Sequence, residues 1–172
     1  MHMKTETIRI AGVVRQSIVD GPGLRFVVFT QGCPHKCKGC HNPETHSFNG
    51  GYDCEVNKIL LEMEKNPLLK GLAISGGEPF CRPEELLPLV KAVREKGMDV
   101  YCWSGYTFEE LLAMSGMDAA TAELLELIDV LVDGRFVLEE RDLELKLRGS
   151  RNQRILDLKQ SLKEKKPVEI TV

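Results

Sequence analysis

Short apolar runs alternate with amphipathic stretches along this chain, and the alternation predicts strands followed by helices. The run at 25–30 is continuous and rich in β-branched and aromatic residues, as in a strand buried on both faces. Similar runs follow at 72–75, 100–103 and 130–132, with weaker ones at 155–158 and 168–172. Strands that alternate with helices are typical of a parallel sheet.

Helical periodicity and capping residues mark the segments between these runs. After Asp53, a plausible N-cap, apolar residues recur at helical spacing until Pro67 ends the segment. Pro83 suits the first turn of a helix that runs to about Lys96. Two further helices are predicted from a capping box and an N-cap aspartate, namely Thr107 with Glu110, and Asp118.

The length of the chain limits how these units assemble. A closed eight-stranded α/β barrel takes about 250 residues, whereas this chain has 172. At about 150 residues per domain, residues 1–172 form a single domain. We therefore expect an α/β fold, an incomplete parallel β/α barrel of about five or six strands with helices outside.

Composition narrows the class of protein. The chain carries 23 basic and 26 acidic residues, for a net charge of −3, which does not indicate a nucleic-acid binder. Its polar start shows no apolar leader, and no apolar stretch approaches the roughly 18 residues of a membrane span. We expect a cytoplasmic protein that binds neither nucleic acid nor membrane.

The charge is unevenly distributed along the chain. Residues 141–172 hold nine Lys or Arg and five Asp or Glu, a local net charge of +4, which leaves −7 for residues 1–140. A solvated basic helix face is the favoured interpretation, and a docking edge for an acidic partner is the alternative.

Three of the six cysteines form a group with metal-ligand spacing. Cys33, Cys37 and Cys40 stand as Cys-x3-Cys-x2-Cys, just past the strand predicted at 25–30. Ligands gather at the carboxyl ends of strands in parallel sheets, and three thiolates on one loop can hold three corners of a metal centre. The remaining cysteines are scattered and are predicted to be ordinary reduced residues, namely Cys54, Cys81 and Cys102.

The spacing alone leaves two metal centres open. A Cys3His zinc site would take His35 or His41 as its fourth ligand. A [4Fe–4S] cluster held by three thiolates would leave one iron free for a substrate or cofactor. Three unligated thiols are the least favoured interpretation at this spacing.

The residues around these cysteines resemble a known superfamily. The cysteine loop is similar to that of the radical S-adenosylmethionine enzymes, and the run at 20–42 resembles the glycyl-radical-enzyme activases in particular. The run at 74–79, Ile-Ser-Gly-Gly-Glu-Pro, matches the position of the superfamily's Gly-Gly-Glu motif, and 149–155 resembles the C-terminal segment of anaerobic ribonucleoside-triphosphate reductase activating proteins. The resemblance spans residues 13–156 and implies a partial barrel of the radical S-adenosylmethionine type.

The resemblance also implies a reaction. Cys33, Cys37 and Cys40 would hold a [4Fe–4S] cluster whose fourth iron binds the amino and carboxylate groups of S-adenosylmethionine. Reductive cleavage of that cofactor would give a 5′-deoxyadenosyl radical, which takes a hydrogen atom from a glycine of a partner enzyme.

The partner implied is the anaerobic ribonucleotide reductase, with flavodoxin or ferredoxin as the electron donor. Alternatives are another glycyl radical enzyme such as pyruvate formate-lyase, a free metabolite as substrate, and a non-catalytic zinc-binding module.

The resemblance and the strand ends together suggest cofactor contacts. Backbone groups of the cysteine loop would meet the nucleoside, and the Gly-Gly-Glu carbonyls and carboxylate would meet the methionyl ammonium. The turn after 100–103 would reach the ribose or carboxylate, or is a plain turn. These candidates are Gly39, Cys40, His41, Gly76, Gly77, Glu78, Trp103, Ser104 and Gly105. Gly39 stands where the superfamily often has an aromatic residue, and His41 is the substitute ring.

Three further segments have open roles. The turn at 20–23 is favoured as a rigid start to the strand, with entry of a partner loop as the alternative. The run at 133–136 is expected on the active edge. Four polar residues lie near the strand predicted at 155–158, namely Arg148, Arg151, Asn152 and Arg154. They would bind the partner or the cofactor carboxylate, or form a surface salt-bridge network.

Overall fold

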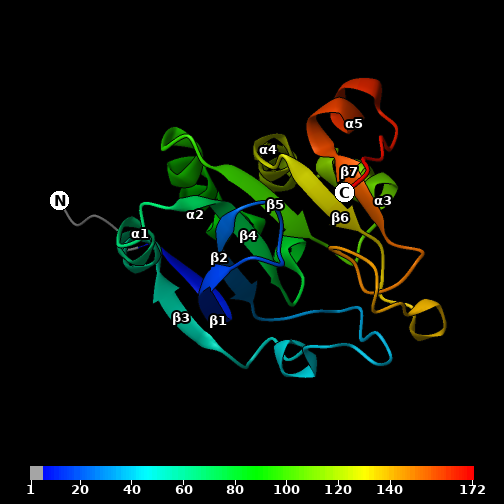
Figure 1. Ribbon diagram of the computed structural model, residues 1–172, viewed down its shortest axis with the longest axis horizontal. Coiled ribbons are helices and arrows are strands. Elements are labelled where there is room, and N and C mark those ends of the chain that lie inside the picture. Colours follow the sequence, from blue (N-terminus) through cyan, green and yellow to red (C-terminus); the bar gives the residue numbers. More distant parts are fainter. Residues whose placement is uncertain (1–5) are drawn as a thin grey trace.

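The computed structural model describes residues 6–172, and its strands form one seven-stranded sheet. The strands are Thr7–Ser17 (β1), Leu24–Thr30 (β2), Tyr52–Glu55 (β3), Leu69–Gly76 (β4), Asp99–Trp103 (β5), Val130–Asp133 (β6) and Arg154–Asp157 (β7). They lie side by side in the order β3-β1-β2-β4-β5-β6-β7 (Figure 1). In the described part of the chain β3 and β7 form the two edges, so the sheet is open.

The first four helices lie where the sequence predicts them, whereas the fifth was not predicted. They are Val56–Glu64 (α1), Pro83–Glu95 (α2), Phe108–Ser115 (α3), Ala119–Leu127 (α4) and Leu158–Glu164 (α5). The capping box of Thr107 and Glu110 is present, and the Asp118 carboxylate accepts a hydrogen bond from the backbone of α4. Asp53 is not the N-cap of α1, because 52–55 pair with β1 and Glu55 takes that position.

The α/β class and the open, partial barrel are confirmed, but the sheet is mixed rather than parallel throughout. The four central strands, β2, β4, β5 and β6, run parallel, whereas β1, β3 and β7 pair antiparallel. A parallel return needs a long crossover, usually a helix. No α-helix lies between β6 and β7, so the predicted fifth strand returns antiparallel. Of 168–172, Glu169 makes an isolated bridge to Leu156.

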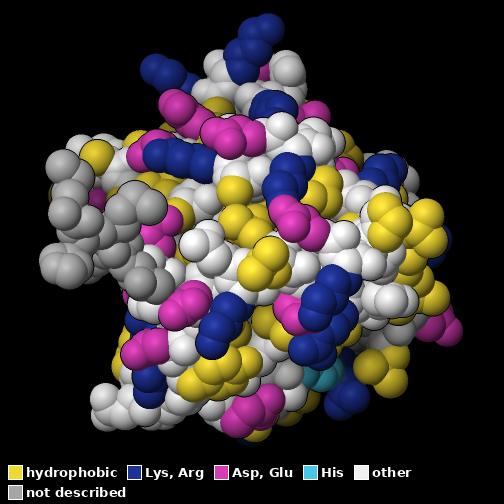
Figure 2. Space-filling model, turned by 90° about the vertical axis from the view of Figure 1, so that its left-hand side faces the viewer, with side chains coloured by type: hydrophobic (Ala, Val, Ile, Leu, Met, Phe, Trp, Pro, Cys, Tyr) yellow, Lys and Arg dark blue, Asp and Glu magenta, His cyan; other side chains and the backbone are white. Residues whose placement is uncertain are grey.

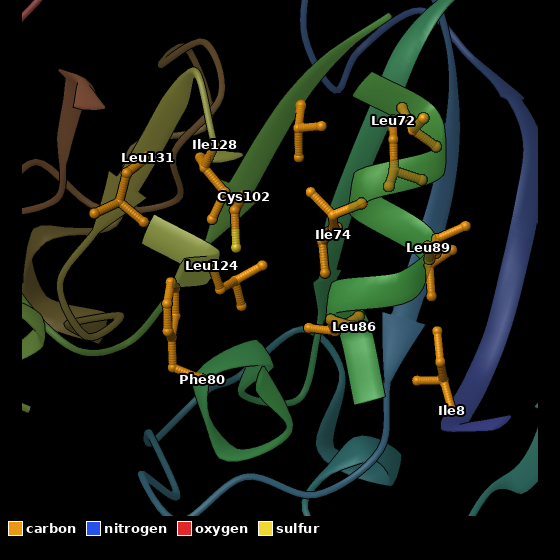
Figure 3. Packing of buried hydrophobic residues seen from close by; sticks show 14 of the residues in the cluster. Ile8, Leu72, Ile74, Phe80, Leu86, Leu89, Cys102, Leu124, Ile128 and Leu131 are labelled. Carbon is orange, nitrogen blue, oxygen red and sulfur yellow. The ribbon is translucent and has the colours of Figure 1, made fainter. Parts of the chain in front are cut away.

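One face of the sheet carries the main hydrophobic core. All five helices contribute buried residues to it, and alternate residues of the strands point toward them. Leu86 and Leu89 of α2 pack near Leu72 and Ile74 of β4 (Figure 3). Cys102 is fully buried in this core and unpaired, as expected for an ordinary reduced cysteine.

The opposite face of the sheet carries a much smaller apolar cluster. It consists of Tyr101, Val130, Val132 and Ile155, with Trp103, Leu147 and Ile170 packed against it. The turn at 18–23 and the segment 145–147 line a cavity of about 640 Å³ beside Tyr101. Because this cavity lies on it, we call this side of the sheet the concave face.

The surface around α1 is highly charged but balanced in sign. On the face shown in Figure 2, basic and acidic side chains are interspersed. Glu62 pairs with Arg15 and Lys65, and Glu64 pairs with Lys96. None of the helices in residues 6–172 combines the length and apolar character needed to span a bilayer.

Candidate active site

The cysteine loop leaves the sheet at the carboxyl end of β2, where parallel α/β sheets place their ligands. Its base is held by backbone bonds: Gly32 donates to Thr45 over 2.7 Å and Cys33 donates to His46 over 3.1 Å. Lys36 and Gly39 then adopt left-handed conformations, with φ of 51° and 77°. These two reversals turn the loop back, so that Cys33, Cys37 and Cys40 share one short segment.

The thiols of this loop are a suitable donor set for an iron–sulfur cluster. All three are partly buried and reduced, and soft thiolates are the ligands that such clusters take. Burial is the main reason why the pKa of Cys33 is raised, and the nearby charges of Glu78 and Cys37 add to it. Within residues 6–172 no three metal-ligating side chains are already grouped closely enough to hold a metal ion.

The Gly-Gly-Glu run continues from β4 and lies against the base of the cysteine loop. Gly77 donates a backbone bond to Thr30, and Glu78 donates one to Gly32, both over 2.8 Å. A Cβ at Gly77 would overlap the carbonyl oxygen of Gly32, and one at Gly76 would come within 2.6 Å of the backbone nitrogen of Thr30. The two glycines therefore allow this close approach of β4 to the cysteine loop.

The Glu78 carboxylate is fully buried and heavily hydrogen-bonded. Its Oε1 accepts from Gly105 N (2.8 Å), and its Oε2 accepts from Phe80 N (2.9 Å). The Ser104 hydroxyl lies 2.9 Å from both oxygens, and His35 Nε2 lies 2.7 Å from Oε1. This one side chain joins the cysteine loop to the ends of β4 and β5.

The Trp103-Ser104-Gly105 turn is also tied internally. Trp103 donates its indole N–H to the carbonyl of Leu147 over 2.6 Å, while the Ser104 hydroxyl and the Gly105 amide are engaged with Glu78. The Trp103 ring still lines a cavity of about 330 Å³ together with His41. A role for this turn in binding the cofactor stays a prediction.

That cavity lies between the cysteine loop and the C-terminal part of the chain. The His41 ring meets the Phe136 ring edge-on, with 5.2 Å between centroids. Asp20 and Arg148 also line it. The His41 ring therefore borders open space. A residue that replaces the aromatic side chain absent at Gly39 would need such a position.

The segment 148–153 is a scaffold for the loop that follows β6. Gln153 accepts from the Gly149 amide over 2.8 Å and donates to the Gly134 carbonyl over 3.0 Å. Asn152 donates to the carbonyl of Arg135 over 2.8 Å. These bonds place Phe136, between Gly134 and Val137, against His41.

The arginines of this region fall into two groups. Arg154 pairs with Asp133, which is buried, and with Glu109, and these bonds raise the pKa of its guanidinium. Arg148 donates to the backbone of Arg151 and Gln153. The salt-bridge interpretation therefore holds for Arg154, whose network includes Asp133. The place of 133–136 on the active edge stays a prediction, and Phe136 of that run lines the cavity beside His41.

Sequence reasoning considered His35 only as a zinc ligand, whereas the structure places its ring against the Glu78 carboxylate. Its partner Glu78 is 43 positions away, and no local pattern links the two. The signal present in the sequence was indirect: each residue lies inside a motif that follows a predicted strand.

The class of protein follows from the similarity of this chain to known protein families. The family model described as a 4Fe–4S single cluster domain matches residues 19–156. The chain therefore belongs to a family of proteins that carry a single 4Fe–4S cluster.

Curated relatives define the branch of that family. The anaerobic ribonucleoside-triphosphate reductase-activating protein of Vibrio cholerae is 41% identical over 144 residues, which cover 79% of this chain and 89% of the relative. The protein of the same name from Escherichia coli K12 is 37% identical over 145 residues, which cover 79% and 90%. This chain belongs to the anaerobic ribonucleoside-triphosphate reductase-activating proteins.

Among solved structures, QueE from Escherichia coli aligns with 59% of this chain and 53% of its own, at 17% identity and a TM-score of 0.49. That likeness is too weak to add to the family assignment. The family itself confirms the resemblance to the activating proteins found in the sequence, and its description agrees with a [4Fe–4S] cluster as the metal centre.

Proposed function

We propose that this protein generates the glycyl radical of an anaerobic ribonucleotide reductase, using a [4Fe–4S] cluster and S-adenosylmethionine. Membership of the activating-protein family carries the proposal. The position of the cysteine loop at the carboxyl end of β2, beside the Gly-Gly-Glu run of β4, supports it.

Cys33, Cys37 and Cys40 are the proposed cluster ligands. When bound, the reduced cluster supplies the electron that splits S-adenosylmethionine into methionine and a 5′-deoxyadenosyl radical, which removes a hydrogen atom from the partner's glycine. The loop's own task is to present three thiolates. Burial raises the pKa of Cys33 and so favours its neutral thiol, whereas a bound metal ion would offset the thiolate charge and favour loss of the proton.

Other residues of the chain orient the cofactor in this proposal. Gly39, Cys40 and His41 offer backbone groups and a ring at the edge of the cavity that Trp103 also lines. Gly76, Gly77 and Glu78 form the adjacent edge, and their backbone carbonyls are proposed to receive the methionyl ammonium. Ser104 and Gly105 support this edge by bonding to Glu78.

The concave face is the proposed entrance for the partner. The main core lies between the sheet and the five helices, whereas the concave face carries only the small Tyr101 cluster. A polypeptide segment of the reductase can therefore approach the cysteine loop from this side. A flavodoxin or ferredoxin is the proposed electron donor, and the reducing cytoplasm, where free thiols persist, is the proposed compartment.

Anaerobic reconstitution followed by mixing with candidate partners tests this function. We expect iron and sulfide in the purified protein, and a glycyl radical signal by electron paramagnetic resonance when the reduced protein and S-adenosylmethionine meet the anaerobic reductase. Pyruvate formate-lyase in the same mixture should give no signal. Bound zinc without sulfide would contradict the proposal, as would a radical formed on pyruvate formate-lyase alone.

Substitution of one proposed ligand gives a residue-level prediction. Cys37→Ala should lose the stable cluster and with it cleavage of S-adenosylmethionine, because two thiolates cannot hold three irons. Cys54→Ala is the matched control, since Cys54 lies on β3 outside the loop and should retain both. Iron content and 5′-deoxyadenosine yield report the outcome, and normal cleavage by Cys37→Ala would refute the ligand assignment.

A further inference from the structure

We propose that Glu78 is a positioning residue whose carboxylate holds the cysteine loop in place through His35, rather than a side-chain ligand of S-adenosylmethionine. This inference rests on the proposed function and refines the part that the Gly-Gly-Glu run plays in it. It assigns the carboxylate to the protein's own architecture and leaves the cofactor to backbone groups.

The first argument is that the Glu78 carboxylate has no acceptor capacity to spare. Its side chain is fully buried, and that of His35 is 5% exposed. Two backbone amides, one hydroxyl and one imidazole nitrogen surround its two oxygens at 2.7–2.9 Å. A carboxylate offers about four lone-pair sites. An incoming ammonium would therefore have to displace a donor that the fold has already placed.

The second argument is that the surroundings of His35 are shaped to receive it. A Cβ at Gly105 would overlap the imidazole ring, so the turn after β5 accommodates His35 because it has a glycine there. The ring of Tyr106 meets the same imidazole edge-on, with centroids 4.5 Å apart. His35 thus inserts into a socket formed by the ends of β4 and β5.

The third argument concerns what else restrains the loop. The backbone bonds of Gly32 and Cys33 hold its base. Between 34 and 40, the contact of His35 with Glu78 is the single side-chain hydrogen bond to a distant element in the described chain. Cys33 and Cys37 lie on either side of His35, so the tie acts where two of the three thiols are positioned.

The consequence is a coupling between the two motifs. A loop that is anchored at its middle loses less conformational entropy when it closes around a metal centre, because part of the ordering is already present. Removing either member of the pair should loosen the loop and weaken its hold on iron. It should not remove a direct contact with S-adenosylmethionine.

The test is a double-mutant cycle on the anaerobically reconstituted protein. His35→Phe keeps a ring against Tyr106 without the N–H, and Glu78→Gln keeps the volume without the full carboxylate. We expect each variant to release iron to a chelator at least about tenfold faster than the wild type. The double variant should be no faster than the worse single one, because residues that act as a unit are not additive.

Two further measurements separate positioning from direct binding. Amides of residues 33–40 in the metal-free protein should exchange hydrogen faster in both variants. In those molecules that keep the cluster, the dissociation constant for S-adenosylmethionine, read from its effect on the cluster's paramagnetic signal, should change less than about threefold. His35→Gln, whose amide can still donate to Glu78, should restore iron retention. Glu126→Gln, on the exposed side of α4, is the control.

The outcomes discriminate between this inference and the proposed function. If Glu78→Gln keeps iron as the wild type does but weakens S-adenosylmethionine binding tenfold, the carboxylate is a direct ligand and the inference is wrong. Independent, multiplying effects of the two substitutions would also overturn it. A wild-type protein that binds zinc and no sulfide would instead refute the proposed function itself. If a variant unfolds, the exchange comparison of wild type and His35→Gln still decides: unequal protection of 33–40 contradicts the anchoring role.

Discussion

Single residues with almost no side chain decide how closely the two motifs approach. Gly77 lies where the backbone of β4 passes the cysteine loop, and any Cβ there meets the carbonyl of Gly32. This is a steric limit set by backbone atoms, which cannot rotate away as a side chain would. At Gly105 the neighbour is instead a side chain, the ring of His35, which Glu78 and Tyr106 hold in place.

Gly77→Ala is therefore expected to push the cysteine loop away from β4. Its cost should be about 1–3 kcal/mol of unfolding free energy, as for overpacked sites, together with faster loss of iron. Gly12→Ala is the control, because a Cβ on Gly12 would meet nothing within 4 Å, and its effect should stay within about 0.5 kcal/mol. Urea unfolding of the metal-free proteins measures both, and equal stabilities would contradict the steric argument.

Among the helices and strands, capping residues set where a helix begins, as at the start of α3. The capping box at Thr107 was readable from four residues and is present in the structure. Its Glu110 also accepts from Arg135, in the loop after β6, over 2.7 Å. The hydrogen bonds from Arg135 and from the Thr107 backbone lower the pKa of Glu110 to about 2. The capping residue Glu110 thus also holds the loop after β6, which lies next to the cysteine loop.

This shift predicts a pH dependence of stability. The pKa of Glu110 is lower in the folded state than its usual value of about 4.3, so its stabilising contribution is complete above that pH and is lost as the pH falls toward 2. Glu110→Gln should cost about 1 kcal/mol or less at pH 7, because the pair is 41–42% exposed. The difference from wild type should shrink as the pH falls below about 4.3 and vanish only below pH 2.

Unfolding curves of metal-free protein between pH 7 and 2 check this dependence. Glutamine can keep the capping hydrogen bond, so the substitution isolates the charge. Glu126→Gln, for which no ion pair forms within the described residues, should track the wild type. A constant difference between Glu110→Gln and wild type across the pH range would show that the ion pair is not responsible.

At the scale of the whole molecule, a buried arginine ties the parallel strands together. Arg25 of β2 is fully buried, passes β4 where Gly71 has no side chain, and pairs with Asp99 of β5. It also donates to the carbonyl of Leu72, and its guanidinium lies 4.3 Å from the centre of the Tyr101 ring. Three neighbouring strands are thus joined on the concave face.

Asp99→Asn is expected to destabilise the protein strongly, because it leaves the buried charge of Arg25 without its partner. The loss should be about 3 kcal/mol or more, a large fraction of the 5–15 kcal/mol typical of a domain. Glu64→Gln breaks the exposed pair with Lys96 and should cost less than about 1 kcal/mol. Denaturant midpoints compare the two, and similar losses would argue against a special role for Arg25.

The parts of the fold that sequence could predict are those with a local cause. Continuous apolar runs marked the central strands, and caps marked α2, α3 and α4. β1 was missed because charged residues such as Arg9 and Arg15 interrupt its apolar pattern, and β3 because Tyr52–Glu55 is short and mostly polar. Both strands form through pairing with distant partners, which leaves no periodicity to read.

The candidate site divides in the same way. The spacing of Cys33, Cys37 and Cys40, and the motif at Gly76–Glu78, were evident from the chain, although their roles stay predictions. Their arrangement relative to one another was not evident from the chain. The bonds of Glu78 to Gly105 and His35 join segments 27 and 43 positions apart.

From the chain alone one can read three thiols at a strand end, a glycine-rich turn after the next strand, and enough similarity to identify the activating-protein family. The arrangement of these parts in space follows from the tertiary structure. It made the outer strands antiparallel, placed Phe136 against His41, and enclosed the Glu78 carboxylate among four donors. The physical reason is that composition and spacing are local, whereas burial and the satisfaction of a buried charge depend on every segment that folds around it.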